Sequence, residues 1–453
     1  MIIDFIKKIF NKNKIERHQK NMEKEIVKKI REYKTTKKYN NMLNGVKYYS
    51  GEHDILKRER TVIGINGQLE VVKNLPNNRI VDNQYRKMVI QKVNYIVGKP
   101  ITIHSDNENY VEELTKILNK KFNKTLKELT IDTLNCGIGW LFLGYNDEGE
   151  FFIKNIKATE ILPEYEEDKL KNIIRFYDDK VEYYDKTGVY FYEVEDEKLK
   201  LIKKEPYILL DNDEYSWNDL PFISFKYNRE EMPLINNVKS LQDGLNIIES
   251  NFQNQMEEDQ RNTILVLVNY DGERLNEFRK NLAVYGAVKV RSDNGGQGDV
   301  RTLQIEVNPE NYIVILDLFK KAIIENAMGF DAKSDKLNTA PNQLNIMSMY
   351  SDIDLDTNNL ETEYQASFEK LIYYINNHLY NTGAGDFENE DYEIIFNRDI
   401  LINESEAIDN VIKSQGILSR ETLIAQHPWI DNVYDELERL KNDLNNFVGI
   451  DEE

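Results

Sequence analysis

Two long helical patterns that flank a short strand-rich segment constrain the fold of this chain more than any other feature. Between Leu234 and Arg261 the only glycine or proline is Gly244. Apolar residues recur there at steps of three or four: Leu234, Val238, Leu241, Leu245, Ile248, Phe252 and Met256. This spacing places them on one face and predicts a helix of about 28 residues, about 42 Å long. A second long helix is predicted from Pro309, a residue suited to a first helical position, to Met328.

The segment between these two helices is predicted to form a small α/β unit. Apolar strand patterns occur at 263–270, 286–292 and 300–307, and a short helical pattern occurs at 275–282. A glycine-rich turn with Gly295, Gly296 and Gly298 separates the last two strands. The chain leaves a larger body through the first helix and returns through the second. We therefore expect the two helices to run antiparallel with the small unit at their tip.

The residues before the first long helix have a β-rich pattern. Segments rich in Val, Ile, Tyr and Phe predict strands at 68–73, 101–106, 140–146, 151–158, 173–178, 180–185 and 189–195. The last two strands are expected to form a hairpin closed at residues 186–188. Helical spacing predicts two interrupting helices, at 79–98 and 111–137. This part of the chain is therefore expected to be an α+β domain.

The C-terminal third is predicted to be mainly helical. The polar segment 330–343 has no periodicity, and a helix of about 35 residues is expected from Leu344 to Leu379. A strand is predicted at 392–402, followed by helix over 405–446.

Charge is unevenly distributed along the 453 residues. Residues 1–40 carry 13 Lys and Arg against 5 Asp and Glu, whereas residues 386–453 carry 5 against 18. We expect residues 1–44 to be a flexible basic arm. A basic arm with an acidic tail is compatible with nucleic-acid binding, but the charge distribution alone favours a solvated N-terminal helix and a solvated helical tail. The net charge of −20 argues against tight DNA binding, which needs Lys and Arg to displace phosphate counterions.

Motifs that carry chemistry are weak in this sequence. Gly98-Lys99 is followed by Pro100, where a phosphate-binding loop needs Ser or Thr. Asp352, Asp354, Asp356 and Glu363 match four positions of an EF-hand loop, but they lie in a helical pattern and are interpreted as a solvated helix face. The five histidines are isolated from one another in the sequence. We therefore expect no catalytic residue, no metal site, no cofactor and no enzymatic activity.

The cysteine content and the lengths of the apolar runs indicate the cellular compartment of the protein. The single cysteine, Cys136, excludes a disulfide framework and fits a reducing environment. No apolar run approaches the roughly 20 residues that span a bilayer, so no membrane association is expected. The opening MIIDFIKKIF is charged within its short apolar stretch and is not expected to act as a signal peptide.

The order of elements resembles the portal proteins of tailed double-stranded DNA phages, in particular the siphovirus type of Gram-positive hosts and their prophages. The segments that carry this resemblance are YYSGEHDIL (48–56), 77–101, CGIGWLFLGYNDEGE (136–150), LPFISFKYN (220–228), 234–251 and 416–440. No single segment is a catalytic signature. Their order, with the helix–small unit–helix arrangement, makes the combined resemblance specific.

The resemblance implies an α+β portal fold with named parts. A β-rich wing would comprise 45–233 with 344–404, and 344–379 would be its long helix. Two stem helices would be formed by 234–262 and 309–329, with a clip between them at 263–308. A tunnel loop would follow at 330–343, and a helical crown would comprise 405–453.

The resemblance also implies a function and partners. Portal proteins form a homo-dodecameric ring at one capsid vertex, nucleate procapsid assembly with scaffolding and major capsid proteins, and dock the terminase large subunit. The ring conducts double-stranded DNA during packaging and ejection and binds the head–tail connector. The expected location is therefore the virion, after assembly in the host cytoplasm.

Two sets of residues are candidates for these roles. The apolar stripe of the first long helix is expected to pack during ring closure: Leu241, Leu245, Ile248, Phe252 and Met256. In the expected tunnel loop, Lys333, Lys336, Asn338 and Asn342 are candidate DNA contacts, with an ordinary mobile loop as the alternative. Two other functions stay open: another phage structural component, such as a baseplate or adhesion protein, or a nuclease that uses clustered carboxylates with Mg²⁺.

Overall fold

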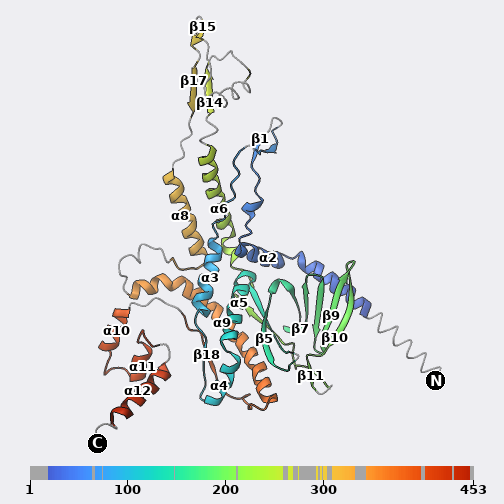
Figure 1. Cartoon of the computed structure of the whole chain (residues 1–453), viewed down its shortest axis with the longest axis vertical. Helices are drawn as coiled ribbons and strands as arrows, with labels where there is room; N and C mark the ends of the chain where they lie inside the picture. Colours follow the sequence, from blue (N-terminus) through green and yellow to red (C-terminus); the bar gives the residue numbers. More distant parts are fainter. Residues whose placement is uncertain are drawn as a thin grey trace, which may run out of the picture. The chain divides into compact units, whose positions relative to one another are not determined.

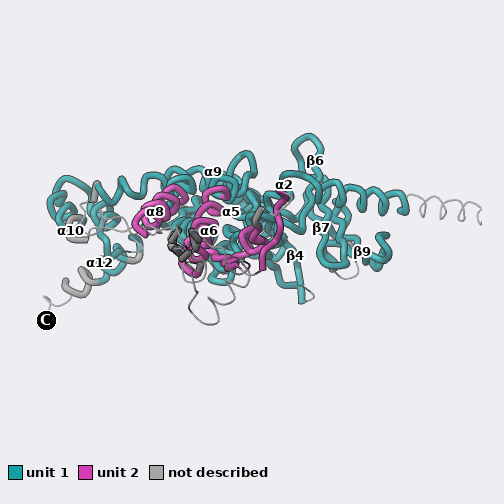
Figure 2. The backbone as a smooth tube through the Cα atoms, turned by 90° about the horizontal axis from the view of Figure 1, so that it is seen from above, with its two compact units in different colours: residues 1–50, 85–238, 324–453 teal, residues 51–84, 239–323 magenta. Residues whose placement is uncertain are grey.

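The chain folds into two compact units in the computed structural model. The structure describes residues 19–63, 67–73, 75–146, 148–210, 213–258, 264–268, 274, 292–293, 296–297, 299–303, 309–331, 343–398, 404–430 and 433–448. Unit 1 comprises 1–50, 85–238 and 324–453, and unit 2 comprises 51–84 and 239–323 (Figure 2). Helices are mixed with antiparallel sheets in the described residues, so the α+β class predicted from the sequence is confirmed.

The main sheet of unit 1 is an antiparallel meander of five strands in sequence order. These are β6 (Ile161–Glu166), β7 (Lys169–Tyr177), β8 (Lys180–Asp185), β9 (Gly188–Glu195) and β10 (Lys198–Glu205). The predicted hairpin is present, with Asp185 paired to Gly188 across its turn. The sequence patterns did not predict β6, which contains Pro163, or β10, whose alternation of lysine and leucine is broken at Ile202 by a register shift.

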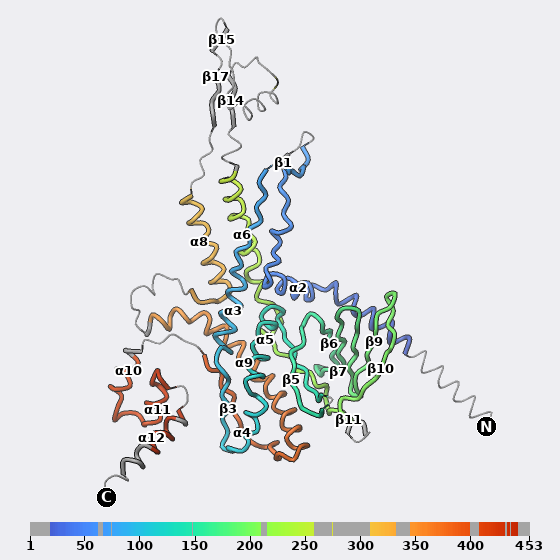
Figure 3. The backbone as a smooth tube through the Cα atoms, in the orientation of Figure 1, coloured from blue at the N-terminus to red at the C-terminus, as the bar shows by residue number. Residues whose placement is uncertain are grey.

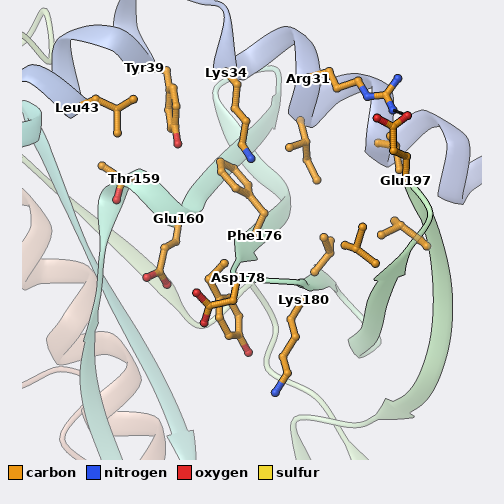
Figure 4. A pocket seen from close by; sticks show the side chains of 16 residues that line it. Arg31, Lys34, Tyr39, Leu43, Thr159, Glu160, Phe176, Asp178, Lys180 and Glu197 are labelled. Carbon is orange, nitrogen blue, oxygen red and sulfur yellow. Dashed lines mark hydrogen bonds and ion pairs between the residues drawn. The ribbon is translucent and has the colours of Figure 1, made fainter.

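A helix over residues 19–34 packs on this sheet. Ile26 and Ile30 are buried, at 3% and 9% exposure, in a cluster with Ile174, Phe176 and Tyr192 of the strands. A cavity of about 490 Å³ lies beside this contact, and an Arg31–Glu197 ion pair of 2.7 Å joins the helix to the sheet across it (Figure 4). The prediction of a flexible arm over 1–44 is therefore wrong for residues 19–44, while residues 1–18 lie outside the described part.

Smaller sheets and helices complete unit 1. The strands are β4 (Ile138–Tyr145), β5 (Phe151–Ile156) and β13 (Phe222–Lys226) in one sheet, β3 (Thr102–His104) with β18 (Glu393–Ile395), and β11 (Ile208–Leu210) with β12 (Asp213–Tyr215). The helices are α2 (Lys37–Ser50), α3 (Gln84–Val97), α4 (Glu108–Ile117), α5 (Lys120–Cys136), α9 (Gln343–Asn381), α10 (Glu404–Lys413), α11 (Arg420–Ala425) and α12 (Val433–Val448), with the short 3-10 turn η2 (Ala158–Glu160). Most of these elements are labelled in Figure 1.

Three predicted helices differ from those observed. The pattern over 111–137 is divided between α4 and α5. Asn119 is the N-cap of α5, because its side chain accepts hydrogen bonds from the N–H groups of Lys121 and Phe122. The pattern over 79–98 becomes helical only at Gln84. The pattern over 405–446 is divided among α10, α11 and α12.

Unit 2 contains most of two long helices and a hairpin. Its elements are η1 (Asp54–Lys57), β1 (Thr61–Ile63), β2 (Leu69–Val71), α6 (Ile235–Glu258), β14 (Ile264–Val268), β15 (Ser292–Asp293), β16 (Gly296–Gln297), β17 (Asp299–Leu303) and α8 (Pro309–Asn326). The two long helices, α6 and α8, are labelled in Figure 3, and each has one end in unit 1. The predicted start of α8 at Pro309 is confirmed. The helix predicted at 275–282 and the strand at 286–291 lie outside the described residues.

No helix among the described residues combines the length and apolar character needed to cross a membrane.

Candidate functional site

Helix α6 buries two chemically different stripes within unit 2. Gln242, Asn246, Ser250 and Asn254 are spaced by four residues, and each is at most 1% exposed. The apolar stripe includes Leu245, which is fully buried, and Phe252. At 3.6 residues per turn these stripes lie about half a turn apart around the helix axis. The helix therefore has a separate partner on each side.

The polar stripe binds an extended segment, residues 76–83, which we name the strap. The N–H groups of Asn78, Ile80 and Asp82 donate to side-chain oxygens of α6, and the distances are 2.7, 2.9 and 3.1 Å. The acceptors are, in order, Asn254 Oδ1, Ser250 Oγ and Asn246 Oδ1. The strap therefore runs antiparallel to the helix.

The strap and the helix match in their repeat lengths. Two extended residues advance about 6.6 Å and four helical residues about 6.0 Å, so every second amide meets every fourth helix residue. Gln242 ends the series by donating from Nε2 to the carbonyl of Asp82 at 2.7 Å. At Asn246 the side-chain amide also contacts Nδ1 of His53 at 2.8 Å. The buried side-chain oxygens of this stripe thus accept hydrogen bonds from main-chain N–H groups of the strap, which are free to donate because the strap is not helical. Among the described residues, Asn254 Nδ2 is buried without a hydrogen-bond partner.

The opposite face of α6 packs against α8. The rings of Phe252 and Tyr312 are 4.6 Å apart, and the Tyr312 hydroxyl donates to Gln255 Oε1 at 2.6 Å. A Cβ atom added to Gly244 would lie 2.5 Å from the ring of Phe319, so glycine permits this close approach. Glycine in the interior of a helix is destabilising, so the presence of Gly244 is explained by this close packing against Phe319.

A lysine of α8 forms ion pairs with both the strap and α6. Lys320 Nζ lies 2.9 Å from Asp82 of the strap and 3.6 Å from Glu249 of α6. The hydrogen bond to Asp82 raises the pKa of Lys320. Burial acts to raise the pKa of Asp82, but the hydrogen bonds from Lys320 and Gln84 outweigh it and hold that pKa below its ordinary value. The charged forms of the Lys320–Asp82 pair are therefore favoured near neutral pH.

The outward face of α8 leaves apolar side chains exposed. Ile313, Val314 and Leu318 are 59%, 58% and 61% exposed. Val314 lies nearly opposite Tyr312 and Phe319, which point toward α6, and Ile313 and Leu318 lie on either side of Val314 around the helix. An exposed apolar stripe of this kind marks an interaction surface when it is contiguous.

The sequence-predicted residues of α6 have different surroundings. Leu245 is buried within its own chain, Phe252 contacts Tyr312, and Met256 is 51% exposed. Leu241 and Ile248 are half-buried. Their role between subunits stays a prediction. The candidates Lys333, Lys336, Asn338 and Asn342 lie outside the described residues.

A buried lysine in unit 1 fixes the chain just after α8. Lys92 of α3 has no exposed side-chain area, and its Nζ lies 3.0 Å from the carbonyl oxygen of Met328 and 2.5 Å from Asp356 Oδ2. The Tyr227 hydroxyl binds the same carboxylate at 2.9 and 3.0 Å. Burial lowers the pKa of Lys92, while the charge of Asp356 opposes that shift. An ion pair therefore holds the main chain at the end of α8.

The next residues of the chain are held by a glutamine and by aromatic stacking. The main chain of Phe330 donates to Gln91 Oε1 at 2.8 Å and accepts from Gln91 Nε2 at 2.6 Å. The Phe330 ring stacks on Tyr350 of α9, with centroids 4.2 Å apart, and Tyr350 stacks on Tyr95. Ile346 and Ile353 complete this cluster. We name the cluster, together with Lys92 and Gln91, the anchor.

Two of the four acidic residues of α9 that resembled an EF-hand loop belong to ion pairs. Asp356 pairs with Lys92, and Asp354 binds the Tyr95 hydroxyl and Arg398 at 3.1 Å. The interpretation of these two carboxylates as a solvated face is therefore wrong. Among the residues that the structure describes, no group of three His, Cys, Asp or Glu side chains is placed to hold a metal ion.

Comparison with known proteins places this chain among the structural proteins of phage particles. Residues 27–446 match the family described as "Phage portal protein, SPP1 Gp6-like". The chain belongs to this family, and the resemblance to phage portal proteins is confirmed.

Two curated portal proteins are similar over most of their length. The portal protein of Bacillus phage SPP1 is 28% identical over 429 residues, which cover 90% of this chain and 84% of that protein. The portal protein of Clostridium phage phiCD119 is 29% identical over 426 residues, which cover 88% of this chain and 91% of that protein. The chain therefore spans nearly the same extent as both relatives.

We predict that Ser250→Ala destabilises unit 2 by about 1–3 kcal/mol, because it leaves the buried N–H of Ile80 without an acceptor. Alanine favours helix more than serine, so α6 itself is not weakened. Hydrogen exchange at the Ile80 amide and the denaturant midpoint measure the effect. Gln253→Ala, on the exposed side of the same helix, is the control and should change neither quantity. Equal exchange rates in the two variants would contradict the strap contact.

We also predict that Lys92→Met costs about 3–5 kcal/mol, because it leaves the carboxylate of Asp356 without its cation in a largely buried site. Denaturant unfolding monitored by tyrosine fluorescence measures this loss. The double variant Lys92→Met/Asp356→Leu serves as the control and should recover part of the stability, since both charges are then removed. If the double variant is less stable than the single one by the full cost of a second mutation, the two residues are not coupled.

Proposed function

We propose that this chain forms a ring at one capsid vertex through which double-stranded DNA passes during packaging and ejection. Membership of the portal family over residues 27–446 is the observation that carries this proposal. The exposed apolar face of α8 supports it, because a helix pair with its outer face uncovered needs a neighbouring copy to bury Ile313, Val314 and Leu318. The ring in the virion is proposed to contain twelve copies.

The parts of the proposed ring follow the observed elements. We propose that α6 and α8 are the stem, that the segment 263–308 between them is the clip, and that the sheets of unit 1 with α9 form the wing. The helices α10, α11 and α12 would be the crown, within 405–453. The anchor then lies where the second stem helix ends and the wing helix begins.

The proposed partners are those that a ring at a capsid vertex would meet. They are the scaffolding and major capsid proteins during procapsid assembly, the terminase large subunit during packaging, and the head–tail connector afterwards. The role is structural, without catalysis or a cofactor, and assembly would occur in the host cytoplasm. The net charge of −20 supports a conduit, because an acidic wall repels phosphates and lets DNA slide.

Ring formation is tested by native mass spectrometry and negative-stain class averages of the purified chain. We expect rings of twelve or thirteen copies with an axial hole. Leu318→Asp should shift the population to smaller species, because it places a charge on the α8 face. Leu318→Met keeps the apolar surface and should assemble like the wild type. A stable trimer or hexamer without a channel would instead favour a baseplate or adhesion component, and cleavage of DNA with Mg²⁺ would favour a nuclease.

We further propose that Lys333, Lys336, Asn338 and Asn342 contact the DNA backbone in the channel. The supporting observation is their position between Phe330 and Tyr350, which belong to one cluster. Lys333→Ala/Lys336→Ala should lower the amount of DNA packaged per particle in an in vitro packaging reaction. Packaging equal to that of the wild type would remove this assignment.

A further inference from the structure

The hairpin of β1 and β2 precedes the strap, and we name this hairpin the arm. It exposes apolar residues on one of its faces. β1 and β2 pair antiparallel, with Thr61 opposite Val71. Leu69 and Val71 are 72% and 53% exposed, and strand alternation places both on the same face of β2. An isolated two-stranded hairpin is at best marginally stable in water. This arm therefore requires a surface to pack on.

The arm is joined firmly to the strap side of α6. The Val72 N–H donates to the Arg60 carbonyl at 2.9 Å, and Asn77 Nδ2 donates to the Arg58 carbonyl at 3.1 Å. Arg60 Nη1 donates to the carbonyl of Pro76, where the strap begins. These hydrogen bonds therefore hold the base of the arm against the start of the strap within unit 2.

The exposed face of α8 lies on the other side of the same unit. The strap and α8 pack on different faces of α6 and touch where Lys320 pairs with Asp82, and Val314 and Leu318 are on the side of α8 away from α6. Both surfaces belong to the same end of α6. Asn78 binds Asn254 and Tyr312 contacts Phe252, only two residues apart on that helix.

We propose that the arm of one copy packs on the exposed α8 face of the next copy, with Leu69 and Val71 against Val314 and Leu318. This inference rests on the proposed ring, because it names the contact between its neighbouring subunits. The two surfaces are different and lie on opposite sides of unit 2, so the contact is head-to-tail, and a rotation that closes it produces a ring.

Charge complementarity supports a second copy as the occupant. Lys73 follows Val71 by two residues and is exposed, and Asp317 is exposed on α8, where it directly precedes Leu318. A cation beside two apolar residues therefore meets an anion beside two apolar residues. Such pairing fixes the register of a contact that apolar packing leaves non-directional.

The first test is site-directed cross-linking in the assembled ring. The chain has one native cysteine, Cys136, and it is buried, so background reaction is low. Copies with Leu69→Cys and copies with Leu318→Cys are mixed, assembled and treated with a short bismaleimide. We expect covalent dimers in the mixture and none from either variant alone.

The outcomes separate this inference from the ring itself. Wild-type rings in native mass spectra, with no cross-link in the mixed sample, overturn the contact and leave the ring. Absence of rings in the wild type overturns the proposed function and the contact together. Dimers from Leu69→Cys copies alone would show a symmetric contact and also overturn the inference.

The second test is charge reversal. Lys73→Glu should weaken association of the subunits by roughly tenfold at low salt, and adding Asp317→Lys in the same chain should restore it. Glu70→Lys reverses a charge on the other face of β2 and is the matched control, with unchanged assembly. Loss of assembly in Lys73→Glu that Asp317→Lys does not restore would contradict the proposed pairing.

Discussion

The hydrogen bonds between α6 and the strap are the constraint on which unit 2 depends. A helix that buries polar side chains normally loses stability, because each group gives up its bonds to water. Here Asn246, Ser250 and Asn254 recover those bonds from main-chain amides. A shift of the strap by one residue would present carbonyls where amides are needed. The register of the strap is thus set by the chemistry of the helix, as it would be in a sheet.

This arrangement decides which surfaces remain for a neighbouring copy. One side of α6 is covered by the strap and the other by α8, so Leu245 contributes to the subunit's own core. The sequence interpretation assigned ring closure to the apolar stripe of α6. That role of α6 stays a prediction, and exposed apolar surface is also present on α8 and on the arm, where Leu318 and Leu69 are more than half exposed.

The sequence predicts the long elements of this fold better than the segments that depend on distant partners. The helices α6, α8 and α9 and the β8–β9 hairpin follow from periodicity and turn residues that are local. Residues 79–83 of the strap were predicted as helix because Ile80 and Val81 extend the apolar pattern of α3, and only the distant stripe of α6 makes the extended form preferable. The helix over 19–34 was predicted to be flexible for the same reason, since Ile26 and Ile30 are buried only by the sheet.

The anchor shows why charged residues are the hardest to interpret from sequence. Asp356 and Lys92 are separated by 264 positions, and nothing in the local pattern of either residue indicates a partner. Once paired, they attach α3 and α9 to the carbonyl of Met328, while Gln91 binds the next segment through both main-chain groups of Phe330. A buried ion pair adds little net stability. Its geometric requirement is strict, however, so it fixes the direction in which the chain leaves α8.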